Sequence, residues 1–281
     1  MTIRIVLLVL LMATNAIAQQ SSGNASPNSS IDPEHIFFTQ PVNGPVTDVT
    51  EPVQGSDIPL HLIYVETRDG LYAPIGLRKP LGNGPFPIIL FAHMKYEDAI
   101  SIIKFVKTLP YVDPNRVGYL GLSHGGEMLM KIASEYDGLR AGIASEPASI
   151  DFLARRPQPR DPNAPPPPET MKENTGEMQH KTVEELRGRI DMSLAMSRIN
   201  AIKTAIFVQE RDRDHHQDIF RLNYELLHDA GKDVQWKSYD DDEHGFIFVR
   251  RDPDGVYRPN PVQLQIVKDS IAYFDRYMKN P

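Results

Sequence analysis

One serine of this chain stands in a setting that can make it a nucleophile. Ser123 is the centre of a Gly-x-Ser-x-Gly pattern at residues 121–125, directly after the apolar run 117–120. A tight turn between a buried strand and a helix holds such a side chain clear of the backbone, where a base can reach its hydroxyl. A serine hydroxyl is a poor nucleophile at neutral pH, so it needs a base and an acid that orients the base.

Both partners follow along the chain in the order acid, then histidine. Asp212 comes shortly after the apolar run 205–208, and His244 comes directly before a Gly-Phe pair near the C-terminal end. Asp214 is a rival for the role of the acid, although we favour Asp212. The pattern predicts covalent catalysis with Ser123 as nucleophile and His244 as base. The alternative interpretation of Ser123 is an ordinary turn between a strand and a helix.

The segment around Asp212 also permits two other interpretations. His215 and His216 follow within it, and two histidines with aspartates can hold zinc or another divalent ion. Because adjacent histidines rarely point at one ion, we expect no metal and no cofactor. A solvated acidic loop is the remaining interpretation.

Acyl transfer also requires two donors aimed at the oxyanion that develops in the transition state. The backbone N–H of His124, directly after the nucleophile, is the first candidate. The second should come from the loop after the apolar run 87–92, where Met94 stands. We therefore expect the N–H groups of His124 and Met94 to form the oxyanion hole.

Strand-like and helix-like segments alternate through most of the chain. The expected strands are residues 87–92, 117–122, 141–144, 205–208 and 234–239. The expected helices are residues 96–108, 125–136, 219–230 and 261–279. This alternation indicates an α/β fold class with a mainly parallel sheet flanked by helices. Residues that follow the strands of such a sheet meet at its carboxyl edge, where sites form.

A hairpin is expected before this alternation begins. Residues 61–65 and 71–77 are strand-like and flank an Asp-Gly pair, which is a strong turn signal. Pro74 cannot donate to a sheet, so it should weaken the second strand or place it at an edge.

Composition divides the chain into three parts. Residues 1–18 have a positively charged start, a short apolar run and a small-residue cleavage site, which predicts a secretory signal peptide. The apolar run is too short for a membrane anchor. Residues 19–58, rich in Ser, Asn, Pro and Gly, are expected to form a flexible N-terminal arm. Residues 59–281 are expected to form the α/β domain.

A proline-rich insertion interrupts this domain at about residues 151–200. Its prolines exclude regular structure over much of its length. A capping box at Thr182 then starts a helix that should place Val183, Leu186, Ile190 and Leu194 on one face. The insertion is either a cap over the site or a solvated surface loop with one docked helix.

Charge and cysteine content limit the partners. The 281 residues carry a formal net charge of −7 and contain no cysteine. An acidic surface disfavours nucleic acid, and the lack of cysteine excludes disulfides and thiolate metal sites. We expect a soluble protein after leader removal, secreted or periplasmic, without a membrane segment and with a small-molecule substrate. The oligomeric state is open.

These residues resemble the α/β-hydrolase superfamily, on the branch shared by prolyl oligopeptidase-type (S9) serine peptidases and dienelactone-hydrolase-like proteins. The resemblance covers roughly residues 63–278. It rests on Phe86–His93, Asp113–Gly126, Asp212 and Glu243–Phe246. It implies the α/β-hydrolase fold, with Ser123 as nucleophile, His244 as base and Asp212 as orienting acid. It also implies hydrolysis of esters or peptides through an acyl-enzyme, without a cofactor.

The chain departs from this family at two places. Members of the family usually have glycines after the histidine that corresponds to His93, where this chain has Met94-Lys95-Tyr96. They also place a further strand and helix before the serine turn, but the segment from His93 to Ser123 has room for one crossover helix. We therefore expect a sheet one strand–helix unit shorter than usual. Dienelactone hydrolases carry cysteine at the turn, so their activity is not expected.

The sequence as a whole predicts an exported serine hydrolase that cleaves an ester, a small peptide or an amide. The alternative is a catalytically impaired protein with the same fold that binds a ligand or a partner. The shortened core and the missing glycines motivate this alternative.

Overall fold

A computed structural model gives the structure of the chain. It describes residues 6–9, 45–53, 55–66, 72–91, 96–147, 152–154, 156, 182–211, 217–249, 252–254, 256 and 258–279. The chain forms two compact units, residues 1–118 and residues 119–281. Within the described ranges, no helix is both long and apolar enough to cross a membrane.

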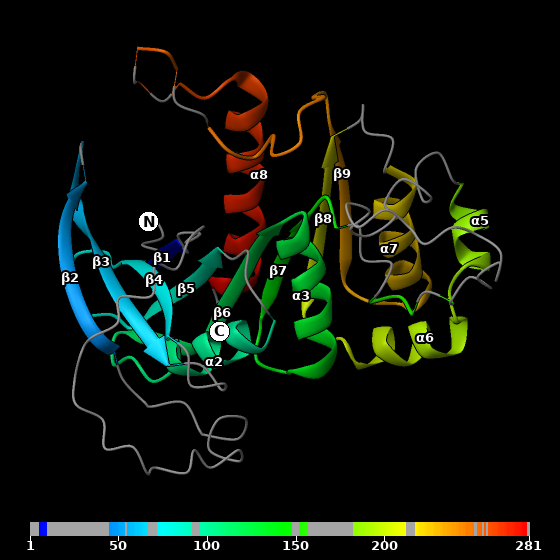
Figure 1. The fold of residues 1–281 in the computed structure, drawn as a ribbon, viewed down its shortest axis with the longest axis horizontal. Helices are drawn as coiled ribbons and strands as arrows, with labels where there is room; N and C mark the ends of the chain where they lie inside the picture. The colour runs from blue at the N-terminus through cyan, green and yellow to red at the C-terminus, as the bar shows by residue number, and fades with distance from the viewer. Residues whose placement is uncertain are drawn as a thin grey trace, which may run out of the picture. The chain divides into compact units, whose positions relative to one another are not determined.

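The first unit is built on a sheet whose strands run in the order β2-β3-β4-β1-β5. The strands are β1 (Val6–Val9), β2 (Pro45–Val53), β3 (Ser56–Glu66), β4 (Tyr72–Arg78) and β5 (Phe86–Phe91). Strands β2, β3 and β4 form an antiparallel meander, and β1 lies antiparallel to β4 and parallel to β5 (Figure 1).

The expected hairpin is confirmed in the pairing of β3 with β4. Their register joins Glu66 to Tyr72 and His61 to Leu77. The interior-facing positions of both strands are buried, because β-strands alternate their side chains between two faces. On its other side β4 pairs with β1 at Gly76–Arg78, so β4 is not an edge strand there, and the described residues of β1 do not pair with Pro74.

The N-terminal part of the chain contributes more strands than composition indicates. Strand β2 lies within the expected arm of residues 19–58 and pairs with β3, while the domain start at residue 59 stays a prediction. Residues 6–9, within the predicted signal peptide, form β1 between β4 and β5. The sheet therefore has an additional strand at this point. Cleavage of the leader stays a prediction.

One helix connects β5 to the strand that carries the serine. Helix α2 (Tyr96–Val106) buries Ala99, Ile102, Ile103 and Val106, whose spacing of three and four places them on one face. Among the described residues of this connection, only α2 separates β5 from β6 (Val112–Leu122). Within its described residues, the connection from β5 to β6 therefore lacks the further strand and helix, as expected. Strand β1 adds a strand between β4 and β5.

Strand β6 starts at Val112, before the expected start of this strand at residue 117. Asp113 accepts a hydrogen bond from the Asn115 backbone N–H at 2.9 Å, and its carboxylate lies 2.7 Å from Arg116 Nε. These contacts organise the polar start of the strand, and the buried part of β6 begins at Val117.

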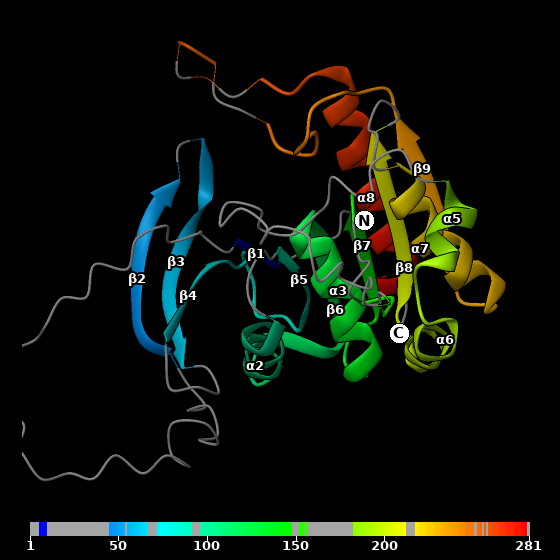
Figure 2. The same ribbon diagram turned by 45° about the vertical axis from the view of Figure 1, so that its right-hand side comes forward.

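The second unit contains a parallel sheet, with the end of β6 followed by β7 (Ala141–Ser145), β8 (Ala205–Arg211) and β9 (Val234–Tyr239). Helices α3 (His124–Glu135) and α7 (Gln217–Asp229) lie on one face, and α8 (Pro261–Met278) lies on the other (Figure 1 and Figure 2). Right-handed crossovers between parallel strands produce this arrangement.

The central strands of this sheet are buried on both faces. Every residue of β7 and all but the last of β8 are buried, which explains why they are nearly continuous apolar runs. On β8, the Phe207 ring packs 5.3 Å from the ring of Tyr273, and Gln209 donates a hydrogen bond to Ser270. Alternate residues of β8 thus fix α8 on the sheet.

The end of the insertion forms two helices instead of one. Helix α5 (Val183–Gly188) has the predicted capping box at Thr182, and α6 (Met192–Ala201) starts afresh at the N-cap Asp191. Leu194 is therefore not part of the buried face, and it is 46% exposed. Helix α5 packs against α7, and α6 packs against α3 and α7. The proline-rich part lies outside the described residues, so the cap stays a prediction.

Candidate active site

The backbone of Ser123 has a conformation that is rare for a residue with a side chain. Its φ is 54° and its ψ is −119°, a combination typical of glycine in tight turns. The Ser123 N–H donates to the Ser145 carbonyl at 2.8 Å, and the Ser123 carbonyl accepts from the Gly126 N–H at 2.9 Å. The end of β7 and the first turn of α3 therefore hold the strained residue in place, as in a nucleophile elbow.

The glycines around Ser123 are required by close backbone contacts. A Cβ atom on Gly121 would lie 2.2 Å from the carbonyl oxygen of Gly125, which no side chain can tolerate. A Cβ on Gly126 would lie 3.0 Å from the Ser145 carbonyl oxygen. The glycines of the motif thus allow the strand, the turn and the helix to approach one another.

His244 faces a buried carboxylate that sequence analysis did not single out. Its Nδ1 atom lies 2.9 Å from Oε2 of Glu146. The His244 side chain is 55% exposed, whereas the Glu146 side chain is fully buried. One ring nitrogen of His244 is therefore held by the protein, while the ring as a whole remains accessible.

Glu146 is itself fixed from two directions. It follows β7 with a φ of 51°, and its N–H donates to the Gln209 carbonyl at 2.8 Å. Its Oε1 atom lies 2.7 Å from Nε of Arg211, whose side chain is 11% exposed. A buried carboxylate is costly unless it is paired, and here Arg211 and His244 each approach one oxygen.

Ser123, Glu146 and His244 belong to one neighbourhood within the second unit. The Ser123 N–H bonds to the residue that precedes Glu146. A Cβ atom on Gly245, next to His244, would lie 3.8 Å from Leu122, next to Ser123. The three residues thus gather near the carboxyl ends of β6, β7 and β9, the edge at which α/β sheets form sites.

His124 begins helix α3 directly after Ser123. The backbone N–H groups of a first helical turn have no carbonyl partner within the helix and attract negative charge. Its side chain is 55% exposed, with Nδ1 3.4 Å from Oε2 of Glu127. The position fits the expected oxyanion donor, and that role stays a prediction.

The other predicted site residues lie outside the described residues. They are Met94, Asp212, Asp214, His215 and His216. The predicted acid and the second oxyanion donor are therefore not placed. Glu146 could have been found from its position directly after the apolar run 141–145, which is where a sheet collects functional side chains.

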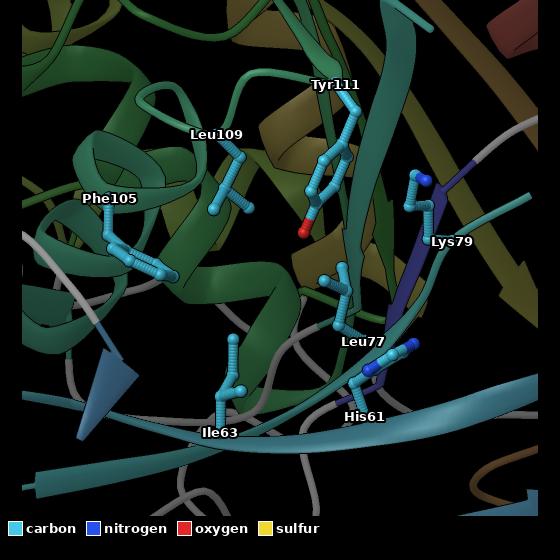
Figure 3. A pocket seen from close by; sticks show the side chains of 7 residues that line it. All are labelled: His61, Ile63, Leu77, Lys79, Phe105, Leu109 and Tyr111. Carbon is cyan, nitrogen blue, oxygen red and sulfur yellow. The ribbon is translucent and has the colours of Figure 1, made fainter. Parts of the chain in front are cut away.

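The first unit contains a hollow of about 170 Å³. The residues that line it come from β3, from β4 and the residue after it, from the end of α2 and from the segment between α2 and β6. They are His61, Ile63, Leu77, Lys79, Phe105, Leu109 and Tyr111 (Figure 3). Lys79 Nζ lies 5.1 Å from the centre of the Tyr111 ring, so the cation is held over an aromatic face. Neither Ser123 nor His244 is among the residues that line this hollow.

Comparison with known proteins identifies the fold. No family model and no curated protein matches the sequence. Among solved structures, a Rhizomucor miehei esterase aligns with a TM-score of 0.56 and 12% identity, covering 81% of this chain and 85% of the esterase. This chain has the α/β-hydrolase fold. The expected fold class is thereby confirmed.

Two peptidases share the hydrolase fold over part of their length. Porphyromonas gingivalis dipeptidyl peptidase 4 aligns with a TM-score of 0.51 and 14% identity, covering 78% of this chain and 36% of the peptidase. Pyrococcus horikoshii acylaminoacyl peptidase aligns with a TM-score of 0.50 and 15% identity, covering 85% of this chain and 42% of the peptidase. The chain thus spans less than half of either peptidase, and at these identities the likeness concerns the fold.

Proposed function

We propose that the protein is a serine hydrolase that cleaves an ester, a small peptide or an amide. The observation that carries this proposal is the glycine-like backbone of Ser123 at the turn between β6 and α3. Strain of this kind costs about 1–3 kcal/mol and is kept at sites where the side chain must be presented. The His244 imidazole, held at Nδ1 in the same unit, supplies a base.

The reaction proceeds in two halves through an acyl-enzyme. Ser123 Oγ attacks the substrate carbonyl carbon while His244 Nε2 takes the hydroxyl proton. The imidazolium then donates this proton to the departing alcohol or amine, which leaves an ester on Ser123. Water attacks that ester with His244 again as base, and the acid product leaves as Ser123 regains its proton. The His124 N–H stabilises the oxyanion in both halves.

We also propose that the protein acts outside the cytoplasm, in the periplasm or as a secreted enzyme. The positively charged start and the apolar run of residues 1–18 support export. The substrate is a small molecule or short peptide, and the proposed chemistry needs neither metal nor cofactor. Asp212 is the acid that the family resemblance assigns, with Asp214 as its rival.

Covalent labelling with a fluorophosphonate probe tests this proposal. The probe should label the wild-type protein, and Ser123→Ala and His244→Ala should abolish labelling. On p-nitrophenyl esters or aminoacyl amides, Ser123→Ala should lower kcat by roughly 10⁴-fold or more, because triad members act as a unit. Ser134→Ala is the matched control, since Ser134 lies on α3 with its hydroxyl bound to the Lys131 carbonyl.

The outcomes also separate the two candidate functions. Well-folded wild-type protein that takes no label would favour the ligand-binding alternative. Label or turnover that survives Ser123→Ala would show that another group performs the chemistry. Comparing esters with aminoacyl amides gives the preferred leaving group.

A further inference from the structure

We propose that Glu146 is the residue that positions His244, so that the acid of the triad comes from the end of β7. This inference rests on the proposed function and names a member of its catalytic set. Glu146, which lies before the insertion, thus takes the role that the sequence analysis gives to Asp212, after β8.

The geometry between the two side chains is that of an orienting acid. Nδ1 of His244 lies 2.9 Å from Oε2 of Glu146, within hydrogen-bond reach. A carboxylate accepts only, so it selects the tautomer with the proton on Nδ1. The lone pair then lies on Nε2, the atom that must take the proton from Ser123. The carboxylate also stabilises the imidazolium that forms when it does.

Arg211 keeps this carboxylate in place. Its Nε lies 2.7 Å from Oε1, which leaves Oε2 for His244. Its Nη1 donates to the Asp242 carbonyl at 3.1 Å, two residues before His244. One guanidinium therefore connects the acid to the segment that carries the base. Ion pairs to both oxygens of one carboxylate restrict the position of Glu146 and of the side chains that face it.

The backbone of Glu146 supports the same role. Its φ of 51° is uncommon for a residue with a side chain, and the Gln209 carbonyl fixes its N–H. Its neighbour Ser145 accepts from the Ser123 N–H. The end of β7 thus holds the nucleophile through one residue and the base through the next. A purely structural carboxylate requires neither the strained backbone nor an accessible imidazole as partner.

Substitution of the acid tests the proposal through a split of kinetic constants. Glu146→Gln keeps the shape of the side chain but removes its charge, and kcat should fall by roughly 10³- to 10⁴-fold with KM changed by less than about threefold. Glu146→Asp should recover part of kcat. Glu225→Gln is the matched control and should keep kcat within about threefold of wild type, because Glu225 lies on α7 and pairs with Arg187 and Arg221 away from His244. Loss of kcat in Asp212→Asn with Glu146→Gln near wild type would overturn the proposal.

A measurement on the unaltered protein covers the case in which Glu146→Gln fails to fold. With ¹⁵N-labelled histidine, neutral His244 should carry its proton on Nδ1, and the ¹H resonance of this N–H should lie downfield. His244→Gln identifies the signal. A His244 ring with its proton on Nε2 would overturn the proposal without any change at Glu146.

The failures of the two proposals are distinguishable. A wild-type protein that takes no fluorophosphonate refutes the proposed hydrolysis, while the Nδ1 proton still reports whether Glu146 holds His244. A labelled protein with an Nε2 proton on His244 refutes the role of Glu146 alone.

Discussion

Ser123 combines a strained backbone, which lowers stability, with the hydroxyl that the proposed hydrolysis requires. Its φ of 54° and ψ of −119° would suit glycine, yet the predicted chemistry requires a hydroxyl at this position. The hydrogen bonds to Ser145 and Gly126 hold the backbone in this conformation. Natural proteins accept strain of this kind at sites where it presents a reactive group.

Replacement of Ser123 by glycine should therefore stabilise the fold while abolishing labelling. We expect Ser123→Gly to raise the free energy of unfolding by about 1 kcal/mol relative to Ser123→Ala, because alanine keeps the Cβ strain and glycine does not. Urea denaturation at pH 7 measures the difference. Equal stability of the two variants would indicate that the turn relaxes around alanine.

At the same scale, the sequence predicted some site residues better than others. The glycine pattern around Ser123 is local, so the turn was recognisable from five residues. Glu146 carries no local motif, and its meaning comes from His244, far away in the chain. Its position after strand β7 makes Glu146 one candidate among several, and only the contact with His244 singles it out.

At the scale of elements, helix α8 is tied to the strand that leads to His244. Asp269 on α8 lies 2.6 Å from Lys237 Nζ and accepts from the Tyr239 hydroxyl at 3.1 Å, both on β9. Burial raises the pKa of Asp269, but hydrogen bonds from Lys237, Gln265 and Tyr239 outweigh it, so its pKa is lowered from 3.8. The ionised carboxylate is thus the form that joins the two elements.

Loss of this charge should destabilise the protein only where Asp269 is ionised. We expect Asp269→Asn to lower the free energy of unfolding by about 1–2 kcal/mol at pH 7, an amount limited by the partly exposed Lys237. A lowered pKa stabilises the folded state above the unfolded value near 3.8 and ceases to do so as the pH falls through the folded value. The difference between variant and wild type should therefore shrink below about pH 4.

Denaturation at pH 7 and at pH 3 measures this dependence. Asp254→Asn is the matched control, because Asp254 pairs with Arg258 at the surface. A difference for Asp269→Asn that is the same at both pH values would contradict the assigned charge.

The elements themselves were predictable where their own residues decide them. The buried strands β5, β7 and β8 each contain a short apolar run, and α2 has an apolar face. Strand β2 was missed because its sequence, PVTDVTEPV, contains two prolines and four polar residues, and its pairing with β3 decides its structure. The insertion was read as one helix because the apolar spacing continues across Asp191, although that residue caps a new helix.

At the scale of the whole molecule, the chain has the α/β-hydrolase fold with a short connection between β5 and β6. The Rhizomucor miehei esterase is covered over 85% of its length, whereas the two peptidases contain much more chain than this protein aligns with. Within the described ranges, one crossover helix connects β5 to β6. Strand β1, which pairs with β5, comes from residues 6–9 near the N-terminus.

Removal of residues 1–18 should loosen the first unit. Strand β1 pairs Leu8 with Leu77 of β4 and with Leu90 of β5, so its loss leaves backbone groups of two strands without these partners. We expect amide hydrogen exchange of residues 76–78 and 88–91 to be at least tenfold faster in residues 19–281 than in the full chain. Residues 141–145 of the second unit should exchange at equal rates in both and serve as the internal control. Equal protection of β4 and β5 in the two proteins would contradict the pairing.

The position of β1 gives residues 6–9 two roles that exclude each other, one in the predicted leader and one in the sheet. As the predicted leader, residues 1–18 would have to reach an export apparatus in an extended, unfolded form, whereas the sheet binds residues 6–9 as a strand between β4 and β5. Early closure of the sheet would hide the leader from the translocation machinery and from the peptidase that cuts behind it. If the protein is exported as proposed, translocation must therefore be faster than folding. Molecules that fold first would keep residues 6–9 as a strand of the sheet.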